Sequence, residues 1–211
     1  MPKLSKGTVA FIVVFLVIII DQASKIWVKT NMFYGESIEI ASWFKICFVE
    51  NPGMAFGLEI GGKLFLTLFR IIAVIFISYY LFLLVKKGYK NGFIACIALI
   101  LAGAFGNIID CVFYGEIFSA STPSHIASFV SIGEGYGDWM HGRVVDMLYF
   151  PLFNGTYPSW FPVVGGDQFI FFSPIFNIAD SAISVGIVLL LIFYRNTLSE
   201  SMQTQKPDEK K

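Results

Sequence analysis

Residues 93–114 read FIACIALILAGAFGNIIDCVFY, and this stretch decides the class of the fold. It is long enough to cross about 30 Å of hydrocarbon as a helix that rises about 1.5 Å per residue. Two of its side chains, Asn107 and Asp110, are strongly polar. A polar or ionisable group inside a bilayer is costly unless it is paired or hydrated, so such groups mark candidate functional sites. The stretch therefore predicts a transmembrane helix that carries part of a site.

Three further apolar stretches, at residues 8–28, 64–85 and 174–194, bring the expected number of transmembrane helices to four. The composition agrees, because the 211 residues are 56% hydrophobic and only 14% charged, whereas a soluble domain carries about 25% charged residues. Lys plus Arg and Asp plus Glu both total 15, and the absence of a basic excess argues against a nucleic-acid binder. The three cysteines have no paired spacing, so they indicate neither a disulfide framework nor a zinc motif.

Two long segments, at residues 31–63 and 115–173, connect the spans and are expected on the outer side of the membrane. The first contains two runs that are typical of short strands. The expected fold class is an all-α membrane protein with four transmembrane helices and a small extracytoplasmic β-rich cradle and loop region. Residues 1–198 are expected to form a single integral membrane domain, and residues 199–211 a disordered cytoplasmic tail.

Basic residues predict the orientation of the chain. Lys86, Lys87 and Lys90 lie in the tight turn between the second and third apolar stretches, and such clusters mark the cytoplasmic side. Both chain ends are then cytoplasmic as well. The first stretch also has the basic start of a cleavable signal peptide, but charged residues near the possible cleavage site at 23–24 disfavour that interpretation.

The polar side chains of the spans gather at one depth. Counted at about 1.5 Å per residue, they lie within about 5–11 Å of the outer boundary: Asp21, Arg70, Asn107, Asp110, Asn177 and Asp180. Because neighbouring spans run in opposite directions, this convergence predicts one shared interior site. Asp21 and Lys25 are four residues apart and so share a helix face, and Gly103 permits close helix approach.

Asp146 lies inside an apolar run, residues 144–150, of the second outer loop. Such a run is expected to dip into the membrane interface and to bring Asp146 to the depth of Asp180. Two carboxylates in a low-dielectric cleft share a proton, so that one acts as a base and the other as an acid, as in aspartic proteases. Two alternatives stay open at this point: the polar groups hold helices together, or they relay protons in a small transporter or channel.

Five motifs give the chain a resemblance to the lipoprotein signal peptidase family, also called signal peptidase II. They are DQASK at 21–25, NPGMAFG at 51–57, GAFGNIID at 103–110, VD at 145–146 and FNIADS at 176–181. Each motif alone is weak, but their order along a chain of four apolar stretches is specific to the family.

The resemblance implies an aspartyl endopeptidase of the bacterial cytoplasmic membrane, active near the outer face. Its substrates would be diacylglyceryl-modified prolipoproteins, cut before the lipidated cysteine. The catalytic pair would be Asp146 and Asp180. The family requires no metal or organic cofactor and is blocked by cyclic peptides. We expect a monomer surrounded by membrane lipid, without a nucleic-acid partner. Substrate binding or pocket support would come from Asp21, Lys25, Asn51, Gly53, Asn107, Asp110, Arg143 and Asn177.

The sequence departs from the family pattern at two places. The family usually has Arg at the position of Cys111, and Arg143 is a candidate replacement. The connection between Asp110 and Asp146 is also much longer than in the family, because residues 116–142 form an extra Gly- and Ser-rich segment. The sequence assigns no role to that segment.

Three other patterns favour ordinary structure over chemistry. Residues 135–138 read GYGD, which matches the Gly-x-Gly-Asp motif of presenilin-type proteases but lies in a polar loop, so we expect a turn. Ser24 and Lys25 are adjacent on a helix and do not face each other as a Ser–Lys dyad would. His125 and His141 lack the spacing of a metal motif.

Overall fold

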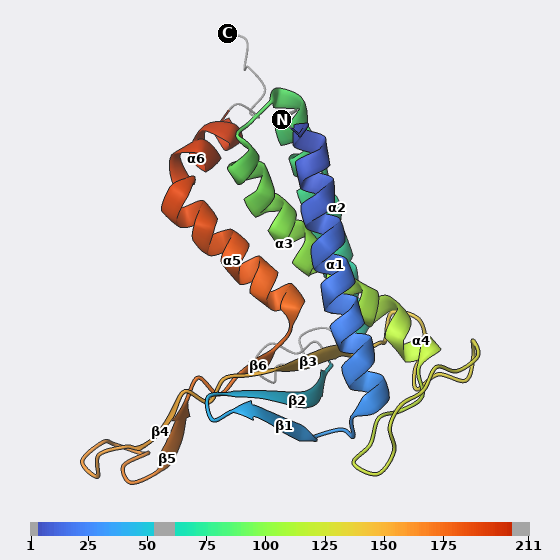
Figure 1. Ribbon diagram of the computed structural model, residues 1–211, viewed down its shortest axis with the longest axis vertical. Coiled ribbons are helices and arrows are strands. Elements are labelled where there is room, and N and C mark those ends of the chain that lie inside the picture. The colour runs from blue at the N-terminus through green and yellow to red at the C-terminus, as the bar shows by residue number, and fades with distance from the viewer. Residues whose placement is uncertain (1–3, 53–61, 204–211) are drawn as a thin grey trace.

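The computed structural model describes residues 4–52 and 62–203, and it consists of a helical part with a small sheet at one end (Figure 1). The helices are α1 (Lys6–Asn31), α2 (Gly62–Lys87), α3 (Asn91–Ile109), the π-helical turn η1 (Asp110–Tyr114), α4 (Gly115–Ile117), α5 (Ile178–Phe193) and α6 (Arg195–Gln203). The strands are β1 (Ser37–Ala41), β2 (Phe44–Asn51), β3 (Val144–Tyr149), β4 (Phe153–Thr156), β5 (Gln168–Phe171) and β6 (Ile175–Phe176).

The expected combination of apolar helices with a β-rich outer region is present, but the all-α label is not confirmed, because the outer segments form two β-sheets. One sheet has the strand order β1-β2-β3-β6, and β4 pairs with β5 in a separate hairpin. All the pairings are antiparallel, and Val49 of β2 lies opposite Asp146 of β3. The reason is local: β3 reads VVDMLY, and such β-branched and aromatic residues favour strands. The predicted cradle is therefore larger and more regular than expected.

Three helices are long and apolar enough to cross a membrane: α1, α2, and α3 with its continuation to Ile117. The fourth predicted stretch differs in structure. It begins as a helix at Ile178, because Ile175 and Phe176 pair with β3 as strand β6. α5 and α6 together pass the same test but are bent by 89°. Among the described residues, the number of candidate spans is thus three, or four if that bent pair counts as one.

Residues 199–203, which the sequence assigns to a cytoplasmic tail, have regular structure. They belong to α6, whose Ser201 is buried and pairs with the hydroxyl of Tyr80 at 2.6 Å. Residues 204–211 lie outside the described part of the chain. The contact anchors α6 to α2.

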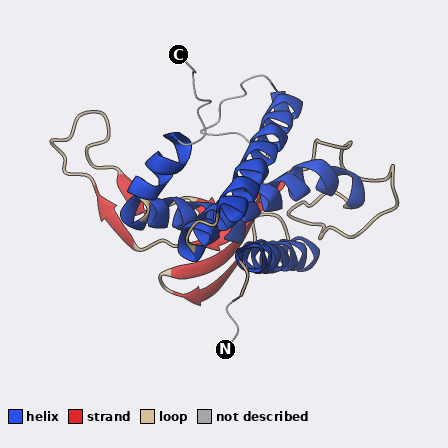
Figure 2. Ribbon diagram, turned by 90° about the horizontal axis from the view of Figure 1, so that it is seen from above, coloured by secondary structure: helices blue, strands red, loops and turns tan. Residues whose placement is uncertain are grey.

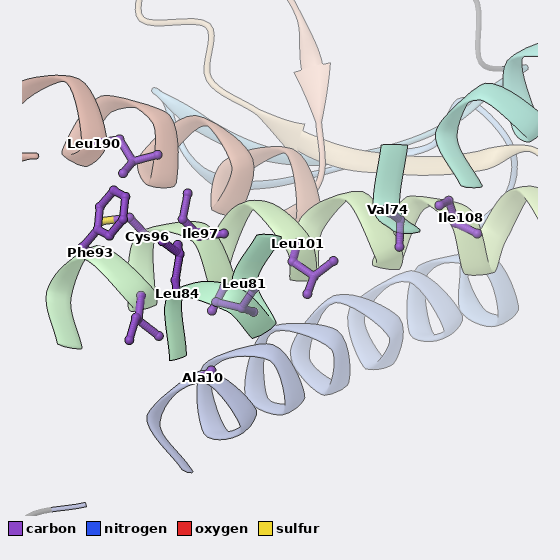
Figure 3. Packing of buried hydrophobic residues seen from close by; sticks show 12 residues of the cluster. Ala10, Val74, Leu81, Leu84, Phe93, Cys96, Ile97, Leu101, Ile108 and Leu190 are labelled. Carbon is purple, nitrogen blue, oxygen red and sulfur yellow. The ribbon is translucent and has the colours of Figure 1, made fainter. Parts of the chain in front are cut away.

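α3 lies at the centre of the helical part, and Figure 2 shows the helices from above. Its side chains Phe93, Ile94 and Ala98 are fully buried. Figure 3 shows Phe93 and Leu101 of the same cluster among residues of α1, α2 and α5. A Cβ at Gly103 would lie only 2.2 Å from the carbonyl oxygen of Ala179 in α5. This confirms that Gly103 lets two helix backbones meet, as small residues do between membrane helices.

The start of α1 and the four-stranded sheet lie at opposite ends of the molecule (Figure 1). The beginning of α1, the α2–α3 turn and α6 share one end, and the four-stranded sheet lies at the other (Figure 1). A second buried cluster joins the sheet to the helices through Val28, Phe48, Tyr114, Val145 and Met147. The sheet is therefore packed onto the helix ends that carry the polar residues.

Candidate active site

The first turn of α5 carries Asp180 in a capping box. Asn177 is the N-cap, and its side-chain oxygen accepts a hydrogen bond from the Asp180 N–H at 2.9 Å. The Asp180 carboxylate in turn accepts from the Asn177 N–H at 3.4 Å. This reciprocal pattern satisfies two backbone donors that a helix start leaves unpaired. The local sequence thus fixes the position of Asp180.

The Asn177 side chain also reaches the second acid of the predicted pair. Its amide nitrogen donates to Asp146 Oδ1 at 2.7 Å and to the Val145 carbonyl oxygen at 3.3 Å. The side chain is fully buried. One asparagine therefore contacts Asp180 with its oxygen and Asp146 with its nitrogen, and it holds the end of α5 beside strand β3.

Asn107 of α3 connects the pair to a buried lysine. Its amide nitrogen donates to Asp180 Oδ1 at 2.8 Å, and its oxygen accepts from Lys25 Nζ at 2.9 Å. The same oxygen also accepts from the Asn177 amide at 3.2 Å. The amide thus has its donor aimed at a carboxylate and its acceptor aimed at a cation.

Lys25 lies between two further carboxylates, both fully buried. Its Nζ is 2.9 Å from Asp21 and 2.8 Å from Asp110. Asp21 accepts the Ala179 N–H at 2.9 Å, and Asp110 accepts the Val145 N–H at 3.2 Å. Each of these acids therefore binds the backbone immediately before one of the predicted catalytic aspartates, since Ala179 precedes Asp180 and Val145 precedes Asp146.

The two predicted catalytic acids differ in their surroundings. Asp146 is 5% exposed, whereas Asp180 is half-buried. Burial, and after it the negative charge of Asp180, raise the pKa of Asp146 to about 7, although hydrogen bonds from Asn177 and Asn51 act in the opposite direction. A carboxyl with such a pKa can hold or release a proton near neutral pH.

Two cavities flank Asp180. One of about 430 Å³ is lined by Phe172, Phe176, Ser181 and Ser184, together with Pro174, Val185 and Asp180 itself. The other, of about 260 Å³, lies between α2, α3 and α5, and its polar lining comes from Arg70, Asn107 and Asp180. Asp180 is thus accessible from two sides, as a group that meets a substrate has to be.

Comparison with known proteins identifies the family. The family model of signal peptidase (SPase) II matches residues 13–195. A lipoprotein signal peptidase of Porphyromonas gingivalis is 52% identical over 207 residues, covering 98% of this chain and 91% of that protein. The chain belongs to the signal peptidase II family. The lipoprotein signal peptidase of Amoebophilus asiaticus is 36% identical over 204 residues, covering 93% of this chain and 82% of its own.

Solved structures agree with this assignment. Two bacterial membrane enzymes superpose with TM-scores of 0.58 and 0.57, at 25% and 27% identity. The first pairing covers 96% of this chain and 94% of the other, and the second covers 87% and 90%. The function is accordingly that of a lipoprotein signal peptidase, a membrane protease. The transporter alternative finds no support among these proteins.

Most residues that the sequence assigns to the site of this signal peptidase lie together. Asp21, Lys25, Asn107, Asp110 and Asn177 form the network just described. Asn51, the last residue of β2, pairs in register with Val144 and forms a hydrogen bond to Asp146. Gly53 lies outside the described residues.

Arg143 is the candidate replacement for the family's Arg at Cys111, and the N–H of the preceding Gly142 donates to the Cys111 carbonyl oxygen at 2.9 Å. The guanidinium of Arg143 donates to Glu50 at 3.1 Å and lies over the ring of Tyr136. The side chain that reaches Cys111 comes from α2: Arg70 donates to the thiol sulfur at 3.1 Å. The spacing along the sequence contained no signal for this, because Arg70 is far from Cys111 in the chain.

Sequence reasoning missed the role of Gln22. Its amide nitrogen donates to Asp21 at 3.1 Å and to Asp110 at 3.0 Å, and its oxygen accepts from the Tyr114 hydroxyl at 3.1 Å. A glutamine beside an aspartate in an apolar helix is itself a signal, because the bilayer penalises both groups.

Sequence reasoning also missed Lys29, one helical turn after Lys25. It is fully buried, pairs with Glu50 and donates to Ser121 at 3.0 Å. Ser121 belongs to the extra segment at 116–142, and this contact fastens that segment to α1 and β2. The GYGD pattern lies in the same loop region, as expected, and its Tyr136 ring faces Lys29.

Among the described residues, no three His, Cys, Asp or Glu side chains gather as a metal site would require. Lys25 lies between Asp21 and Asp110 and supplies positive charge. The amides of Asn107 and Asn177 donate N–H groups to Asp180 and Asp146. The arrangement holds two carboxylates at the junction of β3 and α5, so the chemistry it offers is proton transfer.

Proposed function

We propose that Asp146 and Asp180 are the catalytic pair of an aspartic endopeptidase. Its substrates are diacylglyceryl-modified prolipoproteins, and it cleaves the bond before the lipidated cysteine. The observation that supports this best is the single side chain of Asn177, which hydrogen-bonds Asp146 and caps the helix turn that carries Asp180. Membership of the family supports the proposed substrate class, and the hydrogen bonds of Asn177 support the proposed catalytic pair.

The proposed reaction uses a water molecule between the two carboxyls. Asp146, with a pKa of about 7, holds the proton and donates it to the oxygen of the scissile carbonyl. Asp180, which borders both cavities, accepts a proton from the water as its oxygen attacks the carbonyl carbon. The tetrahedral intermediate then breaks its C–N bond. The proton on Asp180 passes to the leaving amine, and one hydroxyl of the intermediate returns a proton to Asp146, which restores the starting state of the pair.

The supporting residues keep this geometry without taking part in proton transfer. Lys25 balances the charges of Asp21 and Asp110, and those acids hold the N–H groups beside the catalytic pair. Because the donors are already oriented, the reaction needs little reorganisation of the site.

We further propose four membrane crossings, with both chain ends in the cytoplasm and the site near the outer face of the bacterial cytoplasmic membrane. The α2–α3 turn that carries Lys86, Lys87 and Lys90 lies at the same end as the start of α1 and α6 (Figure 1). Clusters of Lys favour the cytoplasmic side. The sheet at the opposite end is then extracytoplasmic, and the sharply bent α6 lies along the inner surface.

The test of this proposal is cleavage of a diacylated precursor by purified protein, followed as a gel shift. Asp146→Asn and Asp180→Asn should each reduce turnover by about 10²- to 10⁴-fold. Asp167→Asn, at an exposed acid near the β4–β5 hairpin, should leave turnover unchanged. A melting curve checks that each variant is folded. Near-normal turnover in either dyad variant would overturn the assignment.

A further inference from the structure

The 260 Å³ cavity between α2, α3 and α5 is lined by a positively charged side chain, Arg70, that the proposed chemistry does not use. Arg70 extends from α2 and lines the cavity together with Asn107 and Asp180. Its side chain therefore shares one space with a member of the proposed catalytic pair.

Within residues 4–52 and 62–203, most of the guanidinium donors of Arg70 have no hydrogen-bond acceptor. Its one contact among the described residues is to the sulfur of Cys111 at 3.1 Å, and no carboxylate in that part of the chain pairs with it. A thiol is a weak acceptor, whereas a guanidinium presents five donors in a planar fork. Lys25 and Lys29, by contrast, are each paired with buried acids.

A charged group of this kind is costly inside a membrane span unless acceptors reach it. The remaining walls of the cavity are apolar or small, with Phe69 and Ile183 among them. Phe69 is 62% exposed, so this side of the cavity borders the surface that faces lipid. A ligand that suits the cavity is therefore apolar over most of its surface and carries oxygen acceptors at one point.

We propose that Arg70 binds carbonyl oxygens of the substrate next to the scissile bond and thereby contributes to substrate affinity. This inference rests on the proposed function, because the diacylglyceryl-modified peptide is the ligand. Two groups of that substrate offer the required chemistry: the ester carbonyls of the diacylglyceryl group and the peptide carbonyls of the signal sequence. Arg70 also places a guanidinium beside Cys111, the position at which the family usually has an arginine.

The test compares Arg70→Met and Arg70→Lys with the parent enzyme on two peptides of identical sequence, one diacylated and one not. Hydrogen bonds to a charged donor predict that Arg70→Met raises KM by about 10- to 100-fold, with kcat nearly unchanged. Arg70→Lys keeps the charge but loses the fork, so its KM should lie between the two. Arg195→Met removes an exposed arginine of α6 and serves as the matched control.

Each outcome has a distinct meaning. A rise in KM confined to the diacylated peptide supports binding through the ester carbonyls, and an equal rise for both peptides supports binding through peptide carbonyls. An unchanged KM for both peptides, or a fall in kcat alone, would overturn the proposal. Failure of the catalytic assignment would be visible separately, as residual turnover in Asp146→Asn or Asp180→Asn.

Discussion

Gly103→Ala should inactivate the enzyme from a position outside the catalytic pair. A Cβ at Gly103 would lie 2.2 Å from the carbonyl oxygen of Ala179 and 2.7 Å from Ile183 Cγ1. A carbon and an oxygen normally stay about 3.3 Å apart, so α5 has to move by about 1 Å. Ala179 directly precedes Asp180, and its N–H is held by Asp21 at 2.9 Å. The shift therefore acts on the dyad itself.

The expected magnitudes follow from that displacement. A misplacement of about 1 Å can cost about 10²-fold in rate. Overpacking costs about 1–3 kcal/mol in stability, and the better helix propensity of alanine returns about 1 kcal/mol. The variant should therefore remain folded while kcat for the diacylated precursor falls about 10²-fold.

Gly7→Ala is the matched control for this experiment. It makes the same substitution in α1, where the new Cβ would meet its nearest neighbour, Val85, at an ordinary 3.8 Å. Turnover and melting temperature should both be preserved. If Gly103→Ala kept full turnover while folded, the claim that the close contact between α3 and α5 sets the dyad geometry would be refuted.

Two further predictions concern buried charge. Burial raises the pKa of Asp146 to about 7, so the folded protein binds this proton more tightly than the unfolded chain, and stability falls as pH rises from about 4 to 7. Asp146→Asn should accordingly raise the melting temperature at pH 8 and change it little at pH 4; an equal shift at both values would contradict this reasoning. Lys25→Met leaves Asp21 and Asp110 buried without their cation and should cost about 3–5 kcal/mol in unfolding free energy. Lys45→Met, at a pair on the surface, should leave the unfolding free energy nearly unchanged, and similar losses for the two variants would argue against the buried network.

The sequence contained enough information to predict most of the site. Asp21 and Lys25 share a helix face because they are four residues apart, and the structure confirms their ion pair. Charged residues such as these are easy to recognise in a membrane-spanning sequence, because each polar residue within an apolar stretch requires a partner. The short motif around Asn177 also has the form of a helix cap, with Asn177 as the N-cap and Asp180 in the first turn.

The rest depended on long-range packing. The contact between Arg70 and Cys111 joins two helices through a side chain whose direction the sequence does not specify. The replacement of a helical start by strand β6 arose because Ile175 and Phe176 found a partner in β3. Strand pairing depends on a neighbour elsewhere in the chain, so the pattern of one segment alone is insufficient.

The position of Lys25 has a consequence for the biosynthesis of the enzyme. Its ammonium group, in the first helix to be synthesised, faces acids that hold the backbones of β3 and of α5, and α5 is the last of the long apolar helices to emerge. A partly inserted chain has the lysine but not the completed pair of aspartates. For the proposed catalytic pair of Asp146 and Asp180, this means that cleavage requires α5 to have docked against α1.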